Sequence, residues 1–125
     1  MTIEAINEQL LRAIGVGVAL LDRSNFGFYF HNDTFEEWFG TQVGTNTLTD
    51  LFEALDVKAL GDGLDQNGRY TAEIRHKKKR RTMVIAFDFT AASEGDQELV
   101  VLVCQNITRI RELESMIDSY SMMVE

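Results

Sequence analysis

The sequence predicts an α+β protein with a five-stranded antiparallel sheet, short helices on one face, and amphipathic helices at both termini. Three observations lead to this fold class. Apolar and polar residues alternate in 70–74 and 83–89, as they do in half-buried strands. Apolar residues recur at intervals of three and four over 3–13 and 110–124, as they do in helices. Strands precede and follow a group of small helices, an order that antiparallel pairing satisfies.

Apolar spacing and turn residues predict the elements of the first half. Residues 2–14 are expected to form a helix that Gly15 ends. Two short apolar segments, 16–21 and 26–31, flank the polar turn at 22–25. These segments are therefore predicted to be strands of one hairpin.

Three short helices are predicted to follow that hairpin. The first covers 34–39, and either Asn32 or Asp33 offers a side-chain oxygen as its N-cap. The second lies at about 48–54, and the third at about 57–65 with its leucines facing inward. All three are short enough to cover one face of a small sheet.

Three strands are predicted in the second half. The alternating segments 70–74 and 83–89 are joined by the basic run 76–81, which is expected to form the tip of a hairpin. The polar turn 93–96 then leads into a continuous apolar strand at 99–104. Each of the three strands is thus expected to pair with the next.

The length of 125 residues fits one domain with a core of its own. We expect an N-terminal helix over 1–14, the sheet-containing core over 15–107 and a C-terminal helix over 108–125. No apolar run approaches the roughly 20 residues of a membrane span, and the single Cys104 excludes an internal disulfide. These features predict a cytoplasmic protein with no membrane span in this chain.

The formal net charge of −8 disfavours nucleic acid as the main partner. The segment 76–81 departs from this average, because it holds five of the twelve Lys and Arg residues. Such a run is typical either of a nucleic-acid patch or of a solvated hairpin tip that discourages edge pairing. We favour the solvated tip and predict no nucleic-acid partner.

Four segments together resemble the PAS family of sensor and dimerisation domains. They are AIGVGVALLD at 13–22, FYFHNDTFEEWFG at 28–40, GTNTLTDLF at 44–52 and NIT at 106–108. The resemblance covers roughly residues 8–112. It implies the five-stranded sheet described above, a sensory role, and a C-terminal helix that carries the signal onward.

The resemblance also implies a junction between the last strand and the exit helix, formed here by Asn106, Ile107 and Thr108. The family usually has Asp where this chain has Asn106. Asn keeps the hydrogen-bonding capacity but not the charge that Asp would offer to Arg109 or Arg111. We therefore expect the hydrogen bonds of the junction to be kept without that charge.

Family members that hold a flavin use a reactive cysteine on a helix, and haem members use a histidine from the helix before the third strand. Cys104 instead lies in the last predicted strand, and the helix at 57–65 contains no histidine. His31 and His76 lie at strand ends. We predict no cofactor and no metal site, with a small-molecule ligand left possible.

A candidate pocket consists of residues expected to face the interior: Phe28, Phe30, Trp38, Asn46, Phe52, Ile85, Phe87 and Cys104. Two interpretations stay open for this set. The aromatic side chains either fill the core completely or surround an apolar or mixed ligand anchored by Trp38 or Asn46. The chain also has no nucleophile–base set, phosphate loop or metal-ligand spacing, so no enzymatic activity is predicted.

The exit helix carries an apolar stripe at the period of a two-stranded coiled coil. Arg109 and Glu114 are spaced for a salt bridge between parallel chains. The residues predicted to form dimer contacts, from both terminal helices, are Leu10, Arg109, Ile110, Leu113, Glu114, Ile117, Tyr120 and Val124. The alternative is that the exit helix folds back over its own sheet.

These patterns favour a cytoplasmic sensory and dimerisation domain that relays a signal to a downstream effector. By resemblance, that effector would be a histidine kinase or a nucleotide cyclase. Two alternatives stay open, a haem- or flavin-dependent redox or light sensor and a constitutive scaffold for protein interactions. In each case the expected assembly is a homodimer.

Overall fold

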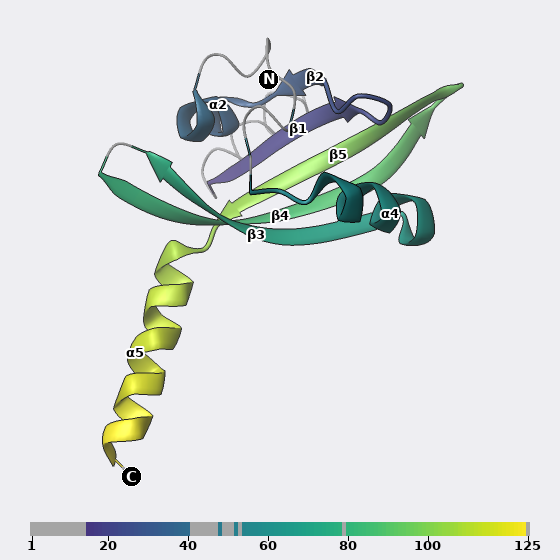
Figure 1. Cartoon of the computed structure of the whole chain (residues 1–125). Coiled ribbons are helices and arrows are strands. Elements are labelled where there is room, and N and C mark those ends of the chain that lie inside the picture. The colour runs from purple at the N-terminus through teal and green to yellow at the C-terminus, as the bar shows by residue number, and fades with distance from the viewer. Residues whose placement is uncertain (1–14, 41–47, 49–51, 53, 79, 125) are drawn as a thin grey trace, which may run out of the picture.

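The computed structural model describes residues 15–40, 48, 52, 54–78 and 80–124 (Figure 1). Five antiparallel strands form one sheet in the order β2-β1-β5-β4-β3. Their bounds are β1 Val16–Asp22, β2 Phe28–His31, β3 Arg69–Lys78, β4 Arg81–Glu94 and β5 Gln97–Asn106. The predicted five-stranded antiparallel sheet is confirmed.

Three helices accompany the sheet in the described part of the chain. They are α2 (Asp33–Phe39), α4 (Val57–Asn67) and α5 (Thr108–Val124). Helix α2 contacts β1, and α4 contacts β3 and β4. Helix α5 instead extends away from the sheet and ends at the C-terminus (Figure 1).

Parts of the prediction lie outside the described residues. The N-terminal helix at 2–14, with Leu10, is one of them, and most of the helix at about 48–54 is another. Leu48 itself is helical and fully buried, and its backbone N–H donates to the Phe26 carbonyl over 3.2 Å.

The connection between β1 and β2 covers residues 23–27 and is one residue longer than the predicted turn at 22–25. The Asp22 carbonyl accepts a hydrogen bond from the Phe26 N–H over 2.8 Å, and Phe26 adopts a left-handed backbone with φ of +55°. A bulky residue rarely takes this conformation, but burial of the Phe26 side chain accompanies it here. Strand β2 therefore begins at Phe28 and not at residue 26.

Asn32 joins α2 to β1. Its side-chain oxygen accepts from the Phe35 N–H over 3.0 Å and so caps the helix. The same oxygen accepts from Val18 N–H over 2.9 Å, while Asn32 Nδ2 donates to the Val16 carbonyl over 2.9 Å. Of the two predicted N-cap candidates, Asn32 is thus the one that caps α2.

Helix α4 has the predicted start and runs two residues further than expected. The Asp56 carboxylate caps it by accepting from the Ala59 N–H over 3.0 Å. Gly68 ends it in the left-handed conformation, with φ of +71°. Leu60 and Leu64 are buried, so the helix covers the sheet with its predicted apolar face.

The predicted alternation of β3 and β4 is confirmed by their register. Ile74 pairs with Ile85 on the core side, whereas Glu73 on the other face is exposed. The ladder continues to the pair Lys78 and Arg81, so the basic run does form a hairpin tip. The buried residues of the core cluster are Ala19, Leu21, Phe26, Phe35, Leu48, Phe52, Leu55, Leu60, Leu64, Ile74, Ile85, Phe87, Phe89, Val100, Leu102 and Cys104.

Candidate functional site

Aromatic rings dominate the interior between the sheet and its helices. The ring centroid of Phe87 lies 4.9 Å from that of Phe52, 6.0 Å from that of Phe89 and 6.2 Å from that of Phe39. Phe39 lies 4.6 Å from Phe35. These edge-on and tilted arrangements are the favourable ones for aromatic pairs, so the rings pack against one another as a continuous cluster.

Most predicted pocket residues lie in or beside this cluster. Phe52, Ile85, Phe87 and Cys104 are buried in it, and Phe28 and Trp38 pack against it. Trp38 also lies over Gly17 of β1, where an added Cβ would be 3.3 Å from a Trp38 ring carbon. The residues expected to share one interior therefore do share it, with two exceptions.

Phe30 is the first exception, and its predicted inward orientation is wrong. Its side chain is 48% exposed. Phe30 pairs with Leu20, whereas Phe28 pairs with Leu21, because an irregularity shifts the register between the two β1 residues. A bulge of this kind interrupts strict alternation, so Phe28 and Phe30 do not share a face. Asn46, the second exception, lies outside the described residues.

Cys104 behaves as a small apolar residue. It is fully buried on β5, and burial raises the pKa of its thiol well above the usual range. A thiol of this kind is a poor nucleophile at neutral pH. The environment therefore fits the prediction that Cys104 is a core residue.

The junction between β5 and α5 is closed by hydrogen bonds. The Asn106 side-chain oxygen accepts from the Thr108 hydroxyl over 2.6 Å and from the Thr108 N–H over 3.1 Å. Thr108 Oγ1 in turn accepts from the Val84 N–H over 2.9 Å, and the Val84 carbonyl accepts from the Ile107 N–H over 2.8 Å. The first residue of α5 is thus bonded both to the end of β5 and to β4.

Arg111 makes a second connection between α5 and the sheet. Its guanidinium forms a two-point ion pair with Glu73 of β3 and donates from Nη1 to Glu114 over 2.8 Å. The Arg111 hydrogen bond lowers the pKa of the Glu73 carboxyl, and both carboxylates raise the pKa of Arg111. Asn106 accepts the hydrogen bonds expected at the junction. The negative charge beside Arg111, which an Asp at position 106 would have offered, comes from Glu73 instead.

Sequence inspection missed the contribution of Glu73. Glu73 and Arg111 are 38 positions apart, and no local pattern relates them. The alternation of β3 does place Glu73 on the outer face of the sheet. Only the tertiary structure brings Arg111 of α5 within contact of Glu73 on that face.

Helix α5 presents its apolar residues to solvent beyond the junction. The exposed fractions are 53% for Ile110, 46% for Leu113, 66% for Met116 and 64% for Ile117. The alternative in which the helix folds back over its own sheet is therefore wrong. The side chains of Tyr120 and Val124 lie outside the described part of the chain.

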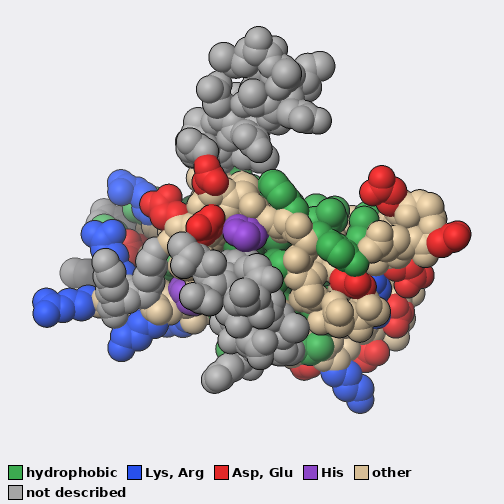
Figure 2. Space-filling model, turned by 90° about the horizontal axis from the view of Figure 1, so that it is seen from above, with side chains coloured by type: hydrophobic (Ala, Val, Ile, Leu, Met, Phe, Trp, Pro, Cys, Tyr) green, Lys and Arg blue, Asp and Glu red, His purple; other side chains and the backbone are tan. Residues whose placement is uncertain are grey.

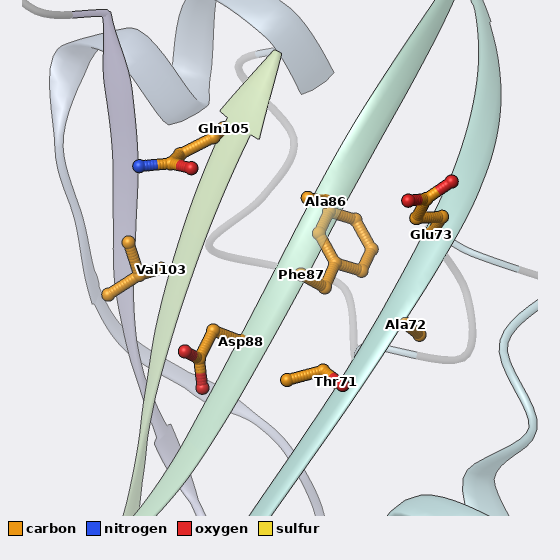
Figure 3. Close-up of a pocket in the computed structure, with 8 residues that line it drawn as sticks. All are labelled: Thr71, Ala72, Glu73, Ala86, Phe87, Asp88, Val103 and Gln105. Carbon is orange, nitrogen blue, oxygen red and sulfur yellow. The ribbon is translucent and has the colours of Figure 1, made fainter. Parts of the chain in front are cut away.

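A hollow of about 470 Å³ lies on the sheet beside this junction (Figure 3). Its lining residues are Thr71, Ala72, Glu73, Ala86, Phe87, Asp88, Val103 and Gln105. Both of its carboxylates are engaged, since Asp88 binds Arg69 over 2.6 Å and Glu73 binds Arg111. The hollow thus shares Glu73 with the connection to α5.

Neither a metal-ligand cluster nor a membrane-spanning helix occurs in the described ranges. Within them, no group of three or more His, Cys, Asp or Glu side chains is arranged to hold a metal ion. Among the helices of these same residues, none combines the length and apolar character required to cross a bilayer.

Several solved structures similar to this chain are PAS domains. One, from a two-component sensor histidine kinase, has a TM-score of 0.62 and 17% identity, covering 82% of this chain and 95% of that one. The PAS domain of nitrogen regulation protein NR(II) from Vibrio parahaemolyticus has a TM-score of 0.65 and 14% identity, with 86% and 100% covered. An RNA-binding light-oxygen-voltage receptor has a TM-score of 0.70 and 15% identity, with 98% and 39% covered.

The chain therefore has the PAS-domain fold, as its sequence motifs indicated. No protein-family model matches the sequence, and no curated protein matches it either. The fold is thus recognised from the arrangement of strands and helices and from the short motifs, at low overall identity.

Proposed function

We propose that this chain is a sensory PAS domain that passes a conformational change from its core to α5. The observation that carries the proposal is the closed junction. Thr108 Oγ1 accepts a hydrogen bond from β4 and donates one to Asn106 at the end of β5. A displacement of either strand would thus be transmitted to the first turn of the helix.

The position of Val84 connects this junction to the core. Val84 bonds to Ile107 and Thr108 through its backbone. The next residue, Ile85, is fully buried in the aromatic and aliphatic cluster. A ligand that repacks the core would move Ile85, then Val84, and then the first turn of α5. The ion pair of Arg111 with Glu73 would limit the angle between α5 and the sheet.

The output of this movement is proposed to be a change in a homodimer. Ile110, Leu113 and Ile117 expose apolar surface along α5, and their spacing is that of a parallel coiled coil. A second α5 would cover this stripe, with Arg109 opposite Glu114 of the other chain. Glu114 is held by Arg111 in the single chain, so dimerisation would redistribute this contact.

The proposed effector is a histidine kinase, with a nucleotide cyclase as the alternative. One of the similar structures supports the first choice, since it comes from a two-component sensor histidine kinase. We propose a cytoplasmic location and no catalytic activity for the domain itself. The absence of a haem or flavin stays a prediction, which the visible absorption spectrum of the purified protein tests.

A constitutive scaffold is the second candidate function. The close packing of Phe87 with Phe39, Phe52 and Phe89 favours it, because rings in direct contact leave no space for a ligand between them. A scaffold would dimerise through α5 without responding to any small molecule.

A ligand screen with a distance readout separates the two functions. Spin labels at Ser115→Cys report the separation of the two α5 helices, because Ser115 is exposed and the native Cys104 is buried. A metabolite that raises the melting temperature should change this distance. In Thr108→Val the rise should persist without the distance change, whereas Thr108→Ser should retain both. A stabilising ligand that leaves the distance unchanged in the unaltered Thr108 protein contradicts the relay.

A further inference from the structure

Positive and negative side chains of this protein are concentrated at opposite ends of the sheet. Cationic residues occupy the β3–β4 hairpin, which we call the basic tip and define as Arg75, Lys77, Lys78, Arg80 and Arg81. Of these, Arg75, Lys77, Arg80 and Arg81 are exposed. Acidic residues occupy the β4–β5 turn, with Glu94 and Asp96 exposed there. Figure 2 shows Lys and Arg side chains concentrated towards one end and Asp and Glu towards the other.

The arginines of the basic tip differ from the arginines that form ion pairs elsewhere in the domain. Arg23 binds Asp65 over 2.9 Å, Arg69 binds Asp88 over 2.6 Å, and Arg111 binds Glu73 and Glu114. Within the described part of the chain, Arg75, Lys77, Arg80 and Arg81 pair with no carboxylate. The positive charge of the tip is therefore not compensated within the described structure.

The register of the β3–β4 hairpin makes the clustered positive charge unfavourable for the stability of the hairpin. Lys78 lies directly opposite Arg81 in the ladder, and like charges at opposed positions destabilise a strand pair. Protection of an edge strand requires only a charge or two. A cluster of this size in a chain with a net charge of −8 instead fits a surface that meets negative charge.

The surroundings of the tip favour carboxylates over nucleic-acid phosphates. His76, which lies between Arg75 and Lys77 of the basic tip, is directed to the core, with its ring centroid 5.0 Å from that of Phe39. It is thus not available to stack on bases, as single-strand binding requires. The rest of the chain is acidic, with Glu112 and Asp118 exposed on the nearby α5, and would repel a long polyanion.

We propose that the basic tip docks an acidic segment of a partner protein. A short carboxylate-rich segment would meet the tip without running along the acidic remainder of the domain. The docked segment would lie near Val84, which belongs to β4 and holds Thr108 at the root of α5. The partner is thus placed beside the helix that leaves the domain.

Fluorescence anisotropy with labelled poly-L-glutamate as the probe tests this proposal at low salt. The triple variant Lys77→Gln/Arg80→Gln/Arg81→Gln should bind about tenfold more weakly than the unchanged protein. Lys77→Gln should weaken binding measurably. Its matched control, Lys58→Gln, removes the same charge from an exposed site on α4 and should leave binding unchanged.

Three results would overturn the proposal. The first is no detectable binding of poly-L-glutamate, and the second is equal binding by the triple variant. The third is tighter, variant-sensitive binding of duplex DNA or of phosphatidylserine vesicles than of poly-L-glutamate, which would make the tip a phosphate-binding surface. The melting temperature of the triple variant should not fall, because the substitutions remove like charges from the hairpin. Its measurement also verifies that the triple variant is folded.

Discussion

The core cluster and α5 use similar apolar residues in opposite ways. Phe87 is 1% exposed and is surrounded by rings, whereas Ile117 is 64% exposed on a helix that leaves the sheet. Apolar area in the core stabilises the single chain as it folds. Equivalent area on α5 contributes nothing until another surface covers it. The difference teaches that apolar burial in the core stabilises the single chain, whereas the apolar stripe of α5 would add stability only in the proposed dimer.

The largest effect should come from emptying the centre of the core. Phe87→Ala should lower the free energy of unfolding by about 3–5 kcal/mol, because it leaves a cavity among the remaining rings. Phe30→Ala is the matched control, because Phe30 is half exposed on the other face. It should cost less than about 1 kcal/mol. Urea denaturation followed by circular dichroism measures both, and equal losses would contradict the assigned faces.

Removal of the Asn32 side chain, which connects α2 to β1 by hydrogen bonds, should have the next largest effect on stability. Asn32→Ala loses a helix cap and two bonds to β1, and should cost about 2 kcal/mol. Asn32→Asp keeps the acceptor for Phe35 but cannot donate to the Val16 carbonyl, so an intermediate loss is expected. Urea titrations decide the order, and an Asp variant weaker than the Ala variant would contradict this account.

A substitution on α5 should separate association from folding. Ile117→Asp should abolish the dimer measured by analytical ultracentrifugation, since it places a charge in the apolar stripe. It should change the stability of the monomeric domain by less than about 0.5 kcal/mol. Ser115→Asp adds the same charge to the exposed side of the helix away from the stripe and should stay dimeric. A dimer that survives Ile117→Asp through α5 contradicts the proposed interface.

The smallest effect should be a pH dependence of the backbone order in the first turn of α5. The Arg111 hydrogen bond places the folded pKa of Glu73 below its unfolded value. The ion pair therefore contributes above the unfolded pKa and is lost as pH falls through the folded pKa. NMR order parameters of amides 109–112 should fall over this acidic range. Glu73→Gln should show lower values already at neutral pH, and identical pH profiles for the two proteins would contradict the connection.

Much of the fold follows from local patterns. The alternation of β3 and β4 identifies their buried faces, and the side chain of Asn32 identifies the start of α2. The failures have specific causes. Strict alternation with Phe28 would place Phe30 in the interior, but the irregularity at Leu20 and Leu21 changes the register. The ion pair of Arg111 could not be predicted, because its partner is on a distant strand.

The sequence alone determined the five strands, helices α2, α4 and α5, the basic tip and the apolar stripe of α5, because periodicity and charge are local properties of the chain. The tertiary structure decided which of these surfaces are covered. It placed Glu73 against Arg111, bonded Val84 to Thr108, and left Ile117 in solvent. These outcomes depend on strand register and on the direction in which α5 leaves the sheet, which are set by contacts between residues far apart in the sequence.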